Sequence, residues 1–369
     1  MSDLYIGLMS GTSMDGIDAA LVDLSTKPKI IATLHRVYPD KLLKRLNALC
    51  NGMPNELKEF SQLDSELGKI FAKTASDLIK QAKLTSEQIT AIGSHGQTIR
   101  HYPKGEHRNS LQIANPNVIT ELCNVTTVAD FRRRDIAAGG EGAPLVPAFH
   151  HAVFHSQNKN RVILNIGGIA NITVLPADNE NPTLGFDTGP GNTLMDNWHA
   201  KHKGASYDKN GDWAKQGAID NTLLKRALSD PYFSRPPPKS TGREHFNLAW
   251  LEDLISALQT NPLAVDIQTT LCEITAISIA QSIQHHAAST DEILICGGGI
   301  HNRHLMQRLK THLEKCTIQS TETYGIHPDW LEAVAFAWLA KQTLDRKPGN
   351  LPSVTGASRA TILGGIYTA

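Results

Sequence analysis

The sequence predicts an α/β protein of two lobes, and three observations carry that prediction. Short strand-like runs rich in β-branched residues open the chain, at residues 4–9, 17–24 and 30–38. A long amphipathic helix and a further strand follow them, giving the order β-β-β-α-β. Three more short strands with glycine turns begin at residue 161, and a late strand at 292–296 opens into Gly297-Gly298-Gly299 before a helix. An element order that repeats along the chain is typical of duplicated lobes.

The loop after the first strand reads Ser10-Gly11-Thr12-Ser13-Met14-Asp15-Gly16. Hydroxyls, backbone N–H groups beside glycine and a carboxylate suit contacts to phosphate and to magnesium or its waters. A polar turn alone would also explain these residues. Helices are expected at residues 40–50 and 56–84, the second with a clear apolar stripe.

A second polar segment, Ser94-His95-Gly96-Gln97-Thr98, ends the strand that begins at residue 91. Open α/β sheets place their ligands at strand ends, although His95 could equally buttress the turn. After a strand-like run at 125–130 comes Phe131-Arg132-Arg133-Arg134-Asp135. Three arginines in a row usually form a solvated face; here we interpret them as loop-borne and able to capture a carboxylate or phosphate.

The second half is organised around residues 165–171 (Asn-Ile-Gly-Gly-Ile-Ala-Asn) and 185–192 (Gly-Phe-Asp-Thr-Gly-Pro-Gly-Asn). Gly167 and Gly168 let the backbone approach a phosphate, and Asp187 stands at the mouth of the next glycine turn. We interpret this stretch as half of a phosphate site with a catalytic base beside it. Further helices are expected at residues 193–201, 219–228, 248–258, 265–286, 302–313 and 328–344, the last carrying Glu332.

Composition narrows the class of protein. The length of 369 residues suits two domains or one large one, and 40% of the residues are apolar. The 36 basic residues balance 36 acidic ones, so no net charge steers the chain toward nucleic acid or a membrane. Five scattered cysteines without a Cys-x-x-Cys pair argue against disulfides and indicate a reducing compartment. With no signal peptide and no membrane-length apolar run, we expect a cytoplasmic protein.

Several common sites are excluded by missing motifs. The chain lacks a P-loop, a Gly-x-Gly-x-x-Gly dinucleotide turn after the first strand, and a Gly-x-Ser-x-Gly elbow. His151 and His155 stand four apart, but no third zinc ligand is in register.

The duplicated lobes and glycine turns resemble the actin/hexokinase/Hsp70 ATPase superfamily, whose lobes are ribonuclease-H-like (β-β-β-α-β-α) around a central cleft. Within it, residues 7–18, 93–98, 130–135, 165–171 and 185–192 are similar to the anhydro-N-acetylmuramic acid kinases, along essentially the whole chain. The Met-Ser-Gly-Thr-Ser-Met-Asp-Gly string is highly specific, and the triple glycine alone is not. We expect lobe I at residues 1–130, joined by the segment from about 350 to 369, and lobe II at 131–349.

The resemblance implies a cytoplasmic, homodimeric kinase of cell-wall (peptidoglycan) recycling. With ATP and Mg²⁺ it opens the 1,6-anhydro bridge of the amino sugar with water and phosphorylates O6, giving N-acetylmuramic acid 6-phosphate and ADP. The implied general base is Asp187, with a role worth roughly 10²–10⁴-fold. The β- and γ-phosphates would meet Gly11, Thr12, Ser13, Met14, Asp15, Gly16, Ile17, Asp18, Gly167 and Gly168, and the adenosine would meet Gly297, Gly298 and Gly299.

The remaining implied roles concern the sugar and the metal. Gln97 and Thr98 would hold sugar hydroxyls, and Arg134 the lactyl carboxylate or the transferring phosphate. Glu332 would orient the sugar or water, or would equally be an ordinary solvated helix glutamate. Asp15 would serve magnesium. The wider superfamily carries an Asp at the end of strand one; here Leu8-Met9-Ser10 stand there and the acid comes later, as Asp15.

Three alternatives remain. An ordinary hexose kinase of the same superfamily would consume no water. A chaperone- or filament-like conformational ATPase would call for an appended binding domain or a polymer surface. A sugar-sensing repressor would need a DNA-binding helix-turn-helix before the first strand, where only three residues precede Leu4.

Overall fold

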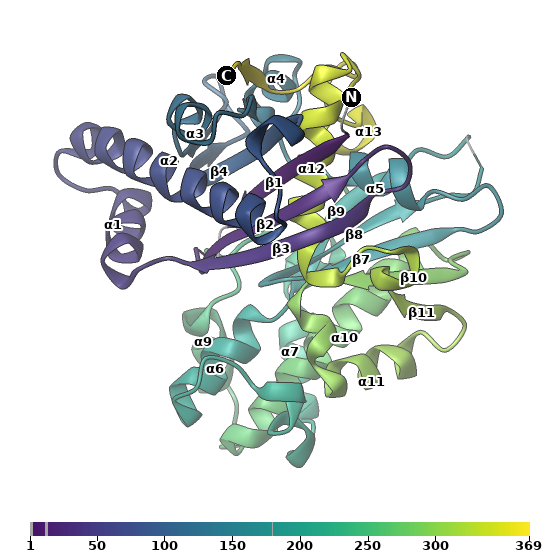
Figure 1. The fold of residues 1–369 in the computed structure, drawn as a ribbon. Helices are drawn as coiled ribbons and strands as arrows, with labels where there is room; N and C mark the ends of the chain where they lie inside the picture. Colours follow the sequence, from purple (N-terminus) through teal and green to yellow (C-terminus); the bar gives the residue numbers. More distant parts are fainter. Residues whose placement is uncertain (1–2, 12–13, 179) are drawn as a thin grey trace. The chain divides into compact units, whose positions relative to one another are not determined.

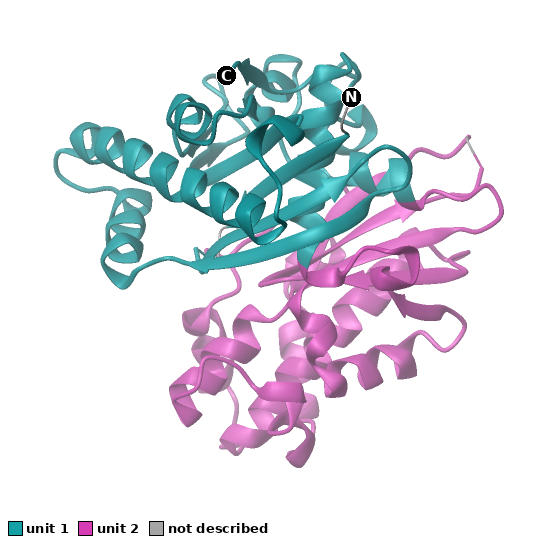
Figure 2. Cartoon of the chain, viewed as in Figure 1, with its two compact units in different colours: residues 1–153, 330–369 teal, residues 154–329 magenta. Residues whose placement is uncertain are grey.

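The computed structural model describes residues 3–11, 14–178 and 180–369. It divides into two compact units, which Figure 2 colours separately. Unit 1 comprises Met1–Val153 and Trp330–Ala369, and unit 2 comprises Phe154–Asp329. Thr12 and Ser13, both expected at the phosphate loop, lie outside the described residues.

Among its described residues, unit 1 holds a seven-stranded sheet of order β12-β6-β4-β1-β2-β3, with β5 paired to β4 (Figure 1). Its strands are β1 Leu4–Ser10, β2 Gly16–Asp23, β3 Lys29–Val37, β4 Ala91–Tyr102, β5 Asn109–Ile113, β6 Thr127–Ala129 and β12 Gly365–Tyr367. Its helices are α1 Asp40–Asn51, α2 Glu56–Gln81, η1 Ser86–Gln88, α3 Pro116–Cys123, α4 Phe131–Ala137, α5 Val146–Phe154, α12 Leu331–Leu344 and α13 Pro352–Thr355. β1 pairs antiparallel with β2 and parallel with β4, so the predicted β-β-β-α-β order is confirmed.

Two glycines let α12 lie directly on the central strands of unit 1. A Cβ on Gly7 in β1 would stand 1.7 Å from the carbonyl oxygen of Ala333, and one on Gly93 in β4 would stand 2.0 Å from that of Phe336. Any side chain at either position would therefore push the helix away. The close approach fixes the first turn of α12, which carries Glu332, above the sheet.

The unit boundary lies later than the expected one. Residues 131–153 and 330–349 belong to unit 1 rather than to the second lobe. Phe131 at the start of α4 packs on Phe336 of α12, with ring centroids 5.5 Å apart. The buried Asp135 accepts hydrogen bonds from Asn350 (2.6 Å) and Thr355 (2.7 Å). These contacts bind α4 and the C-terminal segment into one core.

Unit 2 repeats the topology of unit 1 with five described strands in the order β11-β10-β7-β8-β9. The strands are β7 Arg161–Ile166, β8 Ile169–Leu175, β9 Leu184–Pro190, β10 Glu292–Cys296 and β11 Thr317–Ser320. The helices are α6 Thr193–Lys203, η2 Lys209–Gly211, η3 Ala214–Gln216, α7 Asn221–Leu228, α8 Pro231–Ser234, α9 Leu248–Ser256, α10 Ala264–His286, η4 Gly298–His301, α11 Arg303–His312, η5 Thr321–Tyr324 and η6 Pro328–Trp330, which ends one residue into unit 1. β7, β8 and β9 are antiparallel neighbours and β10 runs parallel to β7, so the predicted duplication is confirmed.

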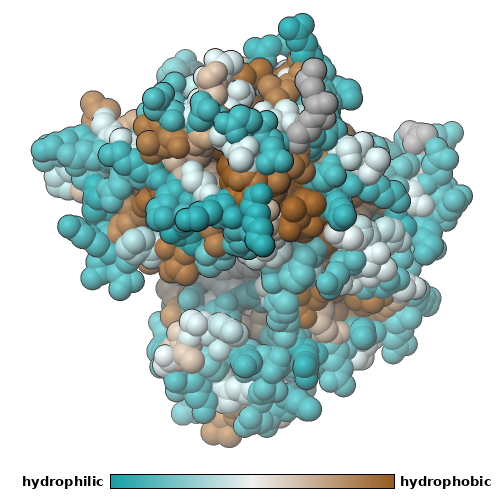
Figure 3. Space-filling view, viewed as in Figure 1, coloured by the Kyte–Doolittle hydropathy of each residue, from teal (hydrophilic) through white to brown (hydrophobic). Residues whose placement is uncertain are grey.

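Within the described residues, no helix is both long and apolar enough to cross a membrane. Figure 3 shows hydrophilic side chains over much of the visible face, interrupted by apolar patches. Some exposed apolar side chains belong to the edge strand β3, where Ile31 is 44% and Val37 67% exposed.

Candidate active site

The loop after β1, where we expect phosphate contacts, is anchored by Ser10, the last residue of that strand. Its hydroxyl accepts a hydrogen bond from the Tyr38 hydroxyl (2.9 Å). It lies 2.8 Å from the Gly16 carbonyl and 2.7 Å from Gln97 Oε1, and it can donate to either. Beyond the two undescribed residues, Met14 has a φ of 57°, a left-handed conformation that a side chain disfavours. The loop is thus held at Ser10 and Gly16 and strained at Met14, and such strain is common at functional sites.

Gln97 and Thr98, both expected to hold sugar hydroxyls, are engaged inside unit 1. Gln97 is fully buried; besides its contact with Ser10, its Nε2 donates to the Gly11 carbonyl (3.1 Å). The Thr98 hydroxyl accepts a hydrogen bond from Gln112 Nε2 (3.1 Å). Gln97 therefore positions the loop after β1, and its expected role as a sugar ligand stays a prediction.

His95 links that loop to α4. Its Nε2 accepts hydrogen bonds from Arg132 Nε (3.1 Å) and Nη2 (2.9 Å), so the ring proton is on Nδ1, which donates to the Gly96 carbonyl (2.8 Å). Burial, together with the Arg132 charge, lowers the pKa of His95 to about 3. The ring therefore stays neutral and holds the turn in place, which is the structural one of the two roles considered for His95.

Carboxylates gather around the first turn of α12. Burial and the negative charges of Asp18 and Asp15 raise the pKa of Glu332, while Arg132 opposes them. Burial lowers the pKa of Arg132 to about 10, and this guanidinium remains cationic at neutral pH. Glu332 is thus no ordinary solvated helix glutamate. Among the described residues no three His, Cys, Asp or Glu side chains form a metal site alone, but Mg²⁺ typically takes only one or two carboxylates along with waters and phosphate oxygens.

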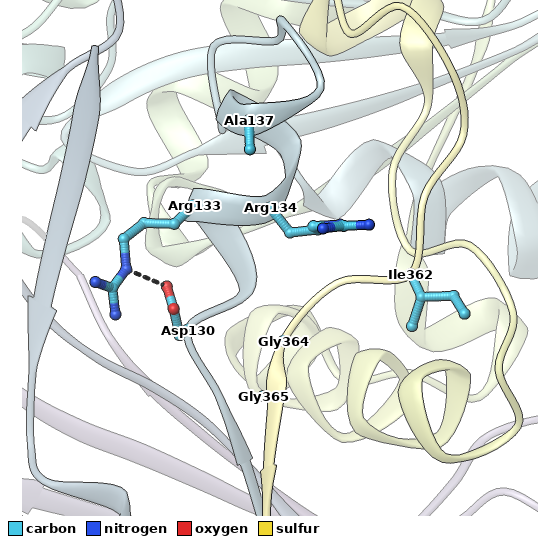
Figure 4. Close-up of a pocket in the computed structure, with 7 residues that line it drawn as sticks. All are labelled: Asp130, Arg133, Arg134, Ala137, Ile362, Gly364 and Gly365. Carbon is cyan, nitrogen blue, oxygen red and sulfur yellow. Dashed lines mark hydrogen bonds and ion pairs between the residues drawn. The ribbon is translucent and has the colours of Figure 1, made fainter. Parts of the chain in front are cut away.

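Arg132, not Arg134, is the arginine that meets this cluster. The segment is helix α4 rather than a loop, and residues two apart on a helix point about 200° apart. Arg134 instead lines a separate hollow of about 590 Å³ with Asp130, Arg133, Ala137, Ile362, Gly364 and Gly365 (Figure 4). Arg133 is paired there with Asp130 (2.7 Å), whereas Arg134 extends toward the Ile362 segment. The expected substrate role of Arg134 thus has no support from its neighbours.

In unit 2 the Gly167–Gly168 turn is tied to the start of α6. The Gly168 carbonyl accepts from the N–H groups of Gly191 (2.9 Å) and Thr193 (3.1 Å), and the Gly167 carbonyl accepts from that of Asn192 (2.8 Å). Because a trans peptide points its C=O and N–H in opposite directions, the Gly168 N–H faces away from α6. Gly168 is exposed, so this N–H is free to meet an anion such as phosphate.

The triple glycine packs against the end of the same strand. A Cβ on Gly297 would lie 2.3 Å from Asn165 Oδ1, and one on Gly299 would lie 2.3 Å from Ile166 Cγ2. Gly298 has open space where its Cβ would be. The two predicted glycine turns of unit 2 therefore meet at the carboxyl end of β7.

A polar row crosses the unit 2 sheet beside these turns. Asn165 of β7 is paired with Asn171 of β8, which is paired with Asp187 of β9. Directly opposed residues of antiparallel strands project to the same face, so the three polar side chains share one face. The other face carries the apolar residues that form the core with α10, including Ile166, Ile172 and Phe186.

Asp187 lies on the edge strand β9 and is held there by residues 239–244, a segment that the sequence analysis did not predict as part of the site. Its Oδ2 accepts the Thr241 backbone N–H (3.0 Å), and its own N–H donates to the Lys239 carbonyl (3.2 Å). The Tyr232 hydroxyl donates to the Asp187 carbonyl (2.8 Å). Burial raises the pKa of Asp187 to about 6, with the Thr241 hydrogen bond and the Lys239 charge opposing the rise and Glu244 adding to it. A carboxylate with a pKa near neutrality is suited to general-base work.

The composition of residues 239–244 could have identified this segment from the sequence. It reads Lys-Ser-Thr-Gly-Arg-Glu directly after three prolines, a hydroxyl and glycine mixture like that of the loop after β1. Its Lys239 is only 9% exposed, with Nζ near the carbonyls of Tyr232 (3.4 Å) and Phe233 (3.3 Å). Such a buried lysine beside the half-buried Asp187 indicates a built site rather than a surface turn.

Known proteins match this chain along nearly its whole length. The family model described as anhydro-N-acetylmuramic acid kinase matches residues 3–369. The chain belongs to the anhydro-N-acetylmuramic acid kinase family. A Coxiella burnetii protein of that name is 53% identical over 363 residues, covering 98% of this chain and 97% of the relative. One from Shewanella oneidensis is 52% identical over 367 residues, covering 99% and 98%.

As a kinase of this family, the protein uses ATP and a small-molecule substrate. Among solved structures, the activator of the 2-hydroxyisocaproyl-CoA dehydratase from Clostridium difficile with bound ADPNP has a TM-score of 0.47 and 12% identity, covering 93% of this chain and 97% of that one.

Proposed function

We propose that this protein hydrolyses the 1,6-anhydro bridge of anhydro-N-acetylmuramic acid and transfers the γ-phosphoryl group of ATP to the freed O6, yielding N-acetylmuramic acid 6-phosphate and ADP in cell-wall recycling. Membership of the family supports the substrate. The observation that carries the chemistry is Asp187, a half-buried carboxylate with a pKa of about 6 beside two glycine turns.

Asp187 accepts the proton of the water that attacks the anomeric carbon. As the new C1–O bond forms, the C1–O6 bond breaks, and O6 bonds to the γ-phosphorus while the bond to the ADP oxygen breaks. The Gly168 N–H and the loop around Gly11 and Gly16 hold the phosphates in line, because phosphoryl transfer depends on positioning and charge neutralisation. The Gly297–Gly299 turn lies against the adenosine.

Magnesium fits the carboxylates of unit 1. At Glu332 the negative charges of Asp18 and Asp15 together outweigh the Arg132 charge, and carboxylate oxygens suit a hard cation. Asp15, within the phosphate loop, is the residue we assign to the metal or its waters. When bound, the ion neutralises charge on the phosphates; Glu332 and Arg132 orient the sugar side.

We further propose a cytoplasmic homodimer, as the family resemblance implies. Free thiols are consistent with a reducing compartment: within the described part of the chain, Cys50, Cys123, Cys272, Cys296 and Cys316 are all unbridged.

Turnover in ¹⁸O-labelled water tests the reaction. We expect one labelled oxygen on the anomeric carbon of the product sugar and none in its phosphate, measured by mass spectrometry with fragmentation. Label in free phosphate alone would mean plain ATP hydrolysis. A phosphorylated sugar without label would mean an ordinary hexose kinase, and either result would overturn the proposal.

The two arginines give a matched test of the site assignment. Arg132→Gln should lower kcat/KM for the sugar by roughly 10²-fold, because a charged, largely buried partner of Glu332 and His95 is lost. Arg134→Gln, an equal chemical change on the other side of α4, should stay within about threefold of the wild type. Steady-state kinetics of both variants measure this, and the opposite ranking would restore Arg134 as the substrate residue.

A further inference from the structure

The Thr241 hydroxyl is a buried polar group that finds no partner among the described residues. Its oxygen is shielded from solvent and makes no hydrogen bond to any of them, while the N–H of the same residue donates to Asp187 Oδ2 (3.0 Å). A buried hydroxyl that makes no hydrogen bond costs free energy, so each such group in a folded protein calls for an explanation.

The surroundings of Thr241 hold three further polar groups. The Asp187 carboxylate accepts the Thr241 N–H (3.0 Å). The Glu244 carboxylate folds back toward the next residue, Gly242, so closely that a Cβ there would lie 2.2 Å from its Oε2. The Lys239 ammonium is turned toward the carbonyls of Tyr232 and Phe233. Two carboxylates and a hydroxyl present mainly acceptor oxygens, which disfavours an anion and suits a ligand that carries O–H groups.

From this geometry we infer that the Thr241 hydroxyl hydrogen-bonds a hydroxylic ligand held against the Asp187 carboxylate. The inference rests on the proposed function. The shared chemistry is an oxygen that can both donate to Asp187 and accept from Thr241, supplied either by the attacking water or by a hydroxyl of the amino sugar. The backbone of Thr241 thus fixes one oxygen of the base, and its side chain directs the ligand to the base.

Thr241→Val tests this, because valine has nearly the shape of threonine and keeps the backbone N–H. We expect kcat/KM for the anhydro-sugar to fall about 10–100-fold and KM for ATP to stay within twofold. Thr241→Ser, which keeps the hydroxyl, should remain within about threefold of the wild type. A fall in kcat with unchanged sugar affinity would identify water as the ligand, and a rise in the sugar KM would identify a sugar hydroxyl.

Thermal stability separates this role from a structural one. Removing an unpartnered buried hydroxyl should leave the Tm of Thr241→Val equal to or above that of the wild type, even as activity falls. A fully active Thr241→Val would overturn the inference. If that variant does not fold, Thr241→Ala carries the same expectation, and full activity there would overturn it equally.

The wild type serves as the reference for both proposals. A wild type that does not turn over the anhydro-sugar would sink the proposed function. A wild type that turns it over while the valine or alanine variant matches it would sink only the role of Thr241.

Discussion

Asp187→Asn is expected to fold, to bind ATP, and to lose roughly 10²–10⁴-fold of its turnover. The amide keeps the size of the carboxylate and can still accept the Thr241 N–H through its oxygen. It cannot take a proton from water, so bond cleavage in the sugar loses its base. Single-turnover phosphorylation of the anhydro-sugar measures the loss, and nucleotide binding by calorimetry is the control. Near-normal turnover would remove Asp187 as the base.

The same substitution should stabilise the fold at neutral pH. The pKa of Asp187 is about 6 in the folded protein against 3.8 as its ordinary value, so the folded state favours the protonated form. Below pH 3.8 the carboxyl is protonated in both states and carries no penalty. As the pH rises through 6, the buried group ionises and destabilises the fold by about 1–3 kcal/mol. The Tm advantage of Asp187→Asn should therefore grow between pH 4 and pH 6 and stay constant above; an advantage independent of pH would contradict the burial argument.

Gly7→Ala should be among the most destabilising single substitutions in unit 1. Its new methyl carbon would fall 1.7 Å from the Ala333 carbonyl oxygen, and backbone cannot yield as a side-chain end can. The expected loss is about 3 kcal/mol or more, or a Tm drop of about 6–12 °C. Activity should fall as well, since α12 carries Glu332 and would move with the displaced turn.

Gly365→Ala is the matched control for that experiment. It lies in the same sheet, on β12, where a Cβ would meet nothing closer than 3.6 Å. Its free energy of unfolding should change by less than about 1 kcal/mol, with a correspondingly small change in Tm. Equal effects of the two substitutions, read by thermal unfolding, would mean that the contact between β1 and α12 is not as close as described.

The strands and long helices of this chain could be predicted from the sequence because their periodicity is strong. The repeated three-strand openings, the triple glycine at β10 and the helices α2, α10 and α11 all stand within a few residues of their expected bounds. Three short helices, α3, α4 and α5, could not be predicted. They are eight, seven and nine residues long, which is too short to show a helical periodicity. α3 and α5 also contain a proline, and α4 contains the run of arginines.

Only part of the candidate site could likewise be predicted from the sequence. The sequence could identify Asp187, Gly168 and the Gly297–Gly299 turn as candidates. Glycine turns and an acidic residue at the end of a strand are recognisable from a few neighbouring residues. Which arginine faces Glu332 depended on α4 being helical, and the partners of Gln97 depended on contacts 87 residues apart in sequence. The Thr241 contact with Asp187 likewise joins residues 54 apart, through a backbone N–H that no sequence pattern identifies.

Unit 1 is assembled from both ends of the chain, and this bears on how the protein is made. A ribosome releases β1 and β4 long before residues 330–369 exist, so the strand faces at Gly7 and Gly93 wait uncovered during synthesis. Unit 2 is contiguous and complete at Asp329, and so can finish packing first. A nascent chain stalled before α12 would present bare β-sheet to the cell, and that is the stage at which chaperones would matter most.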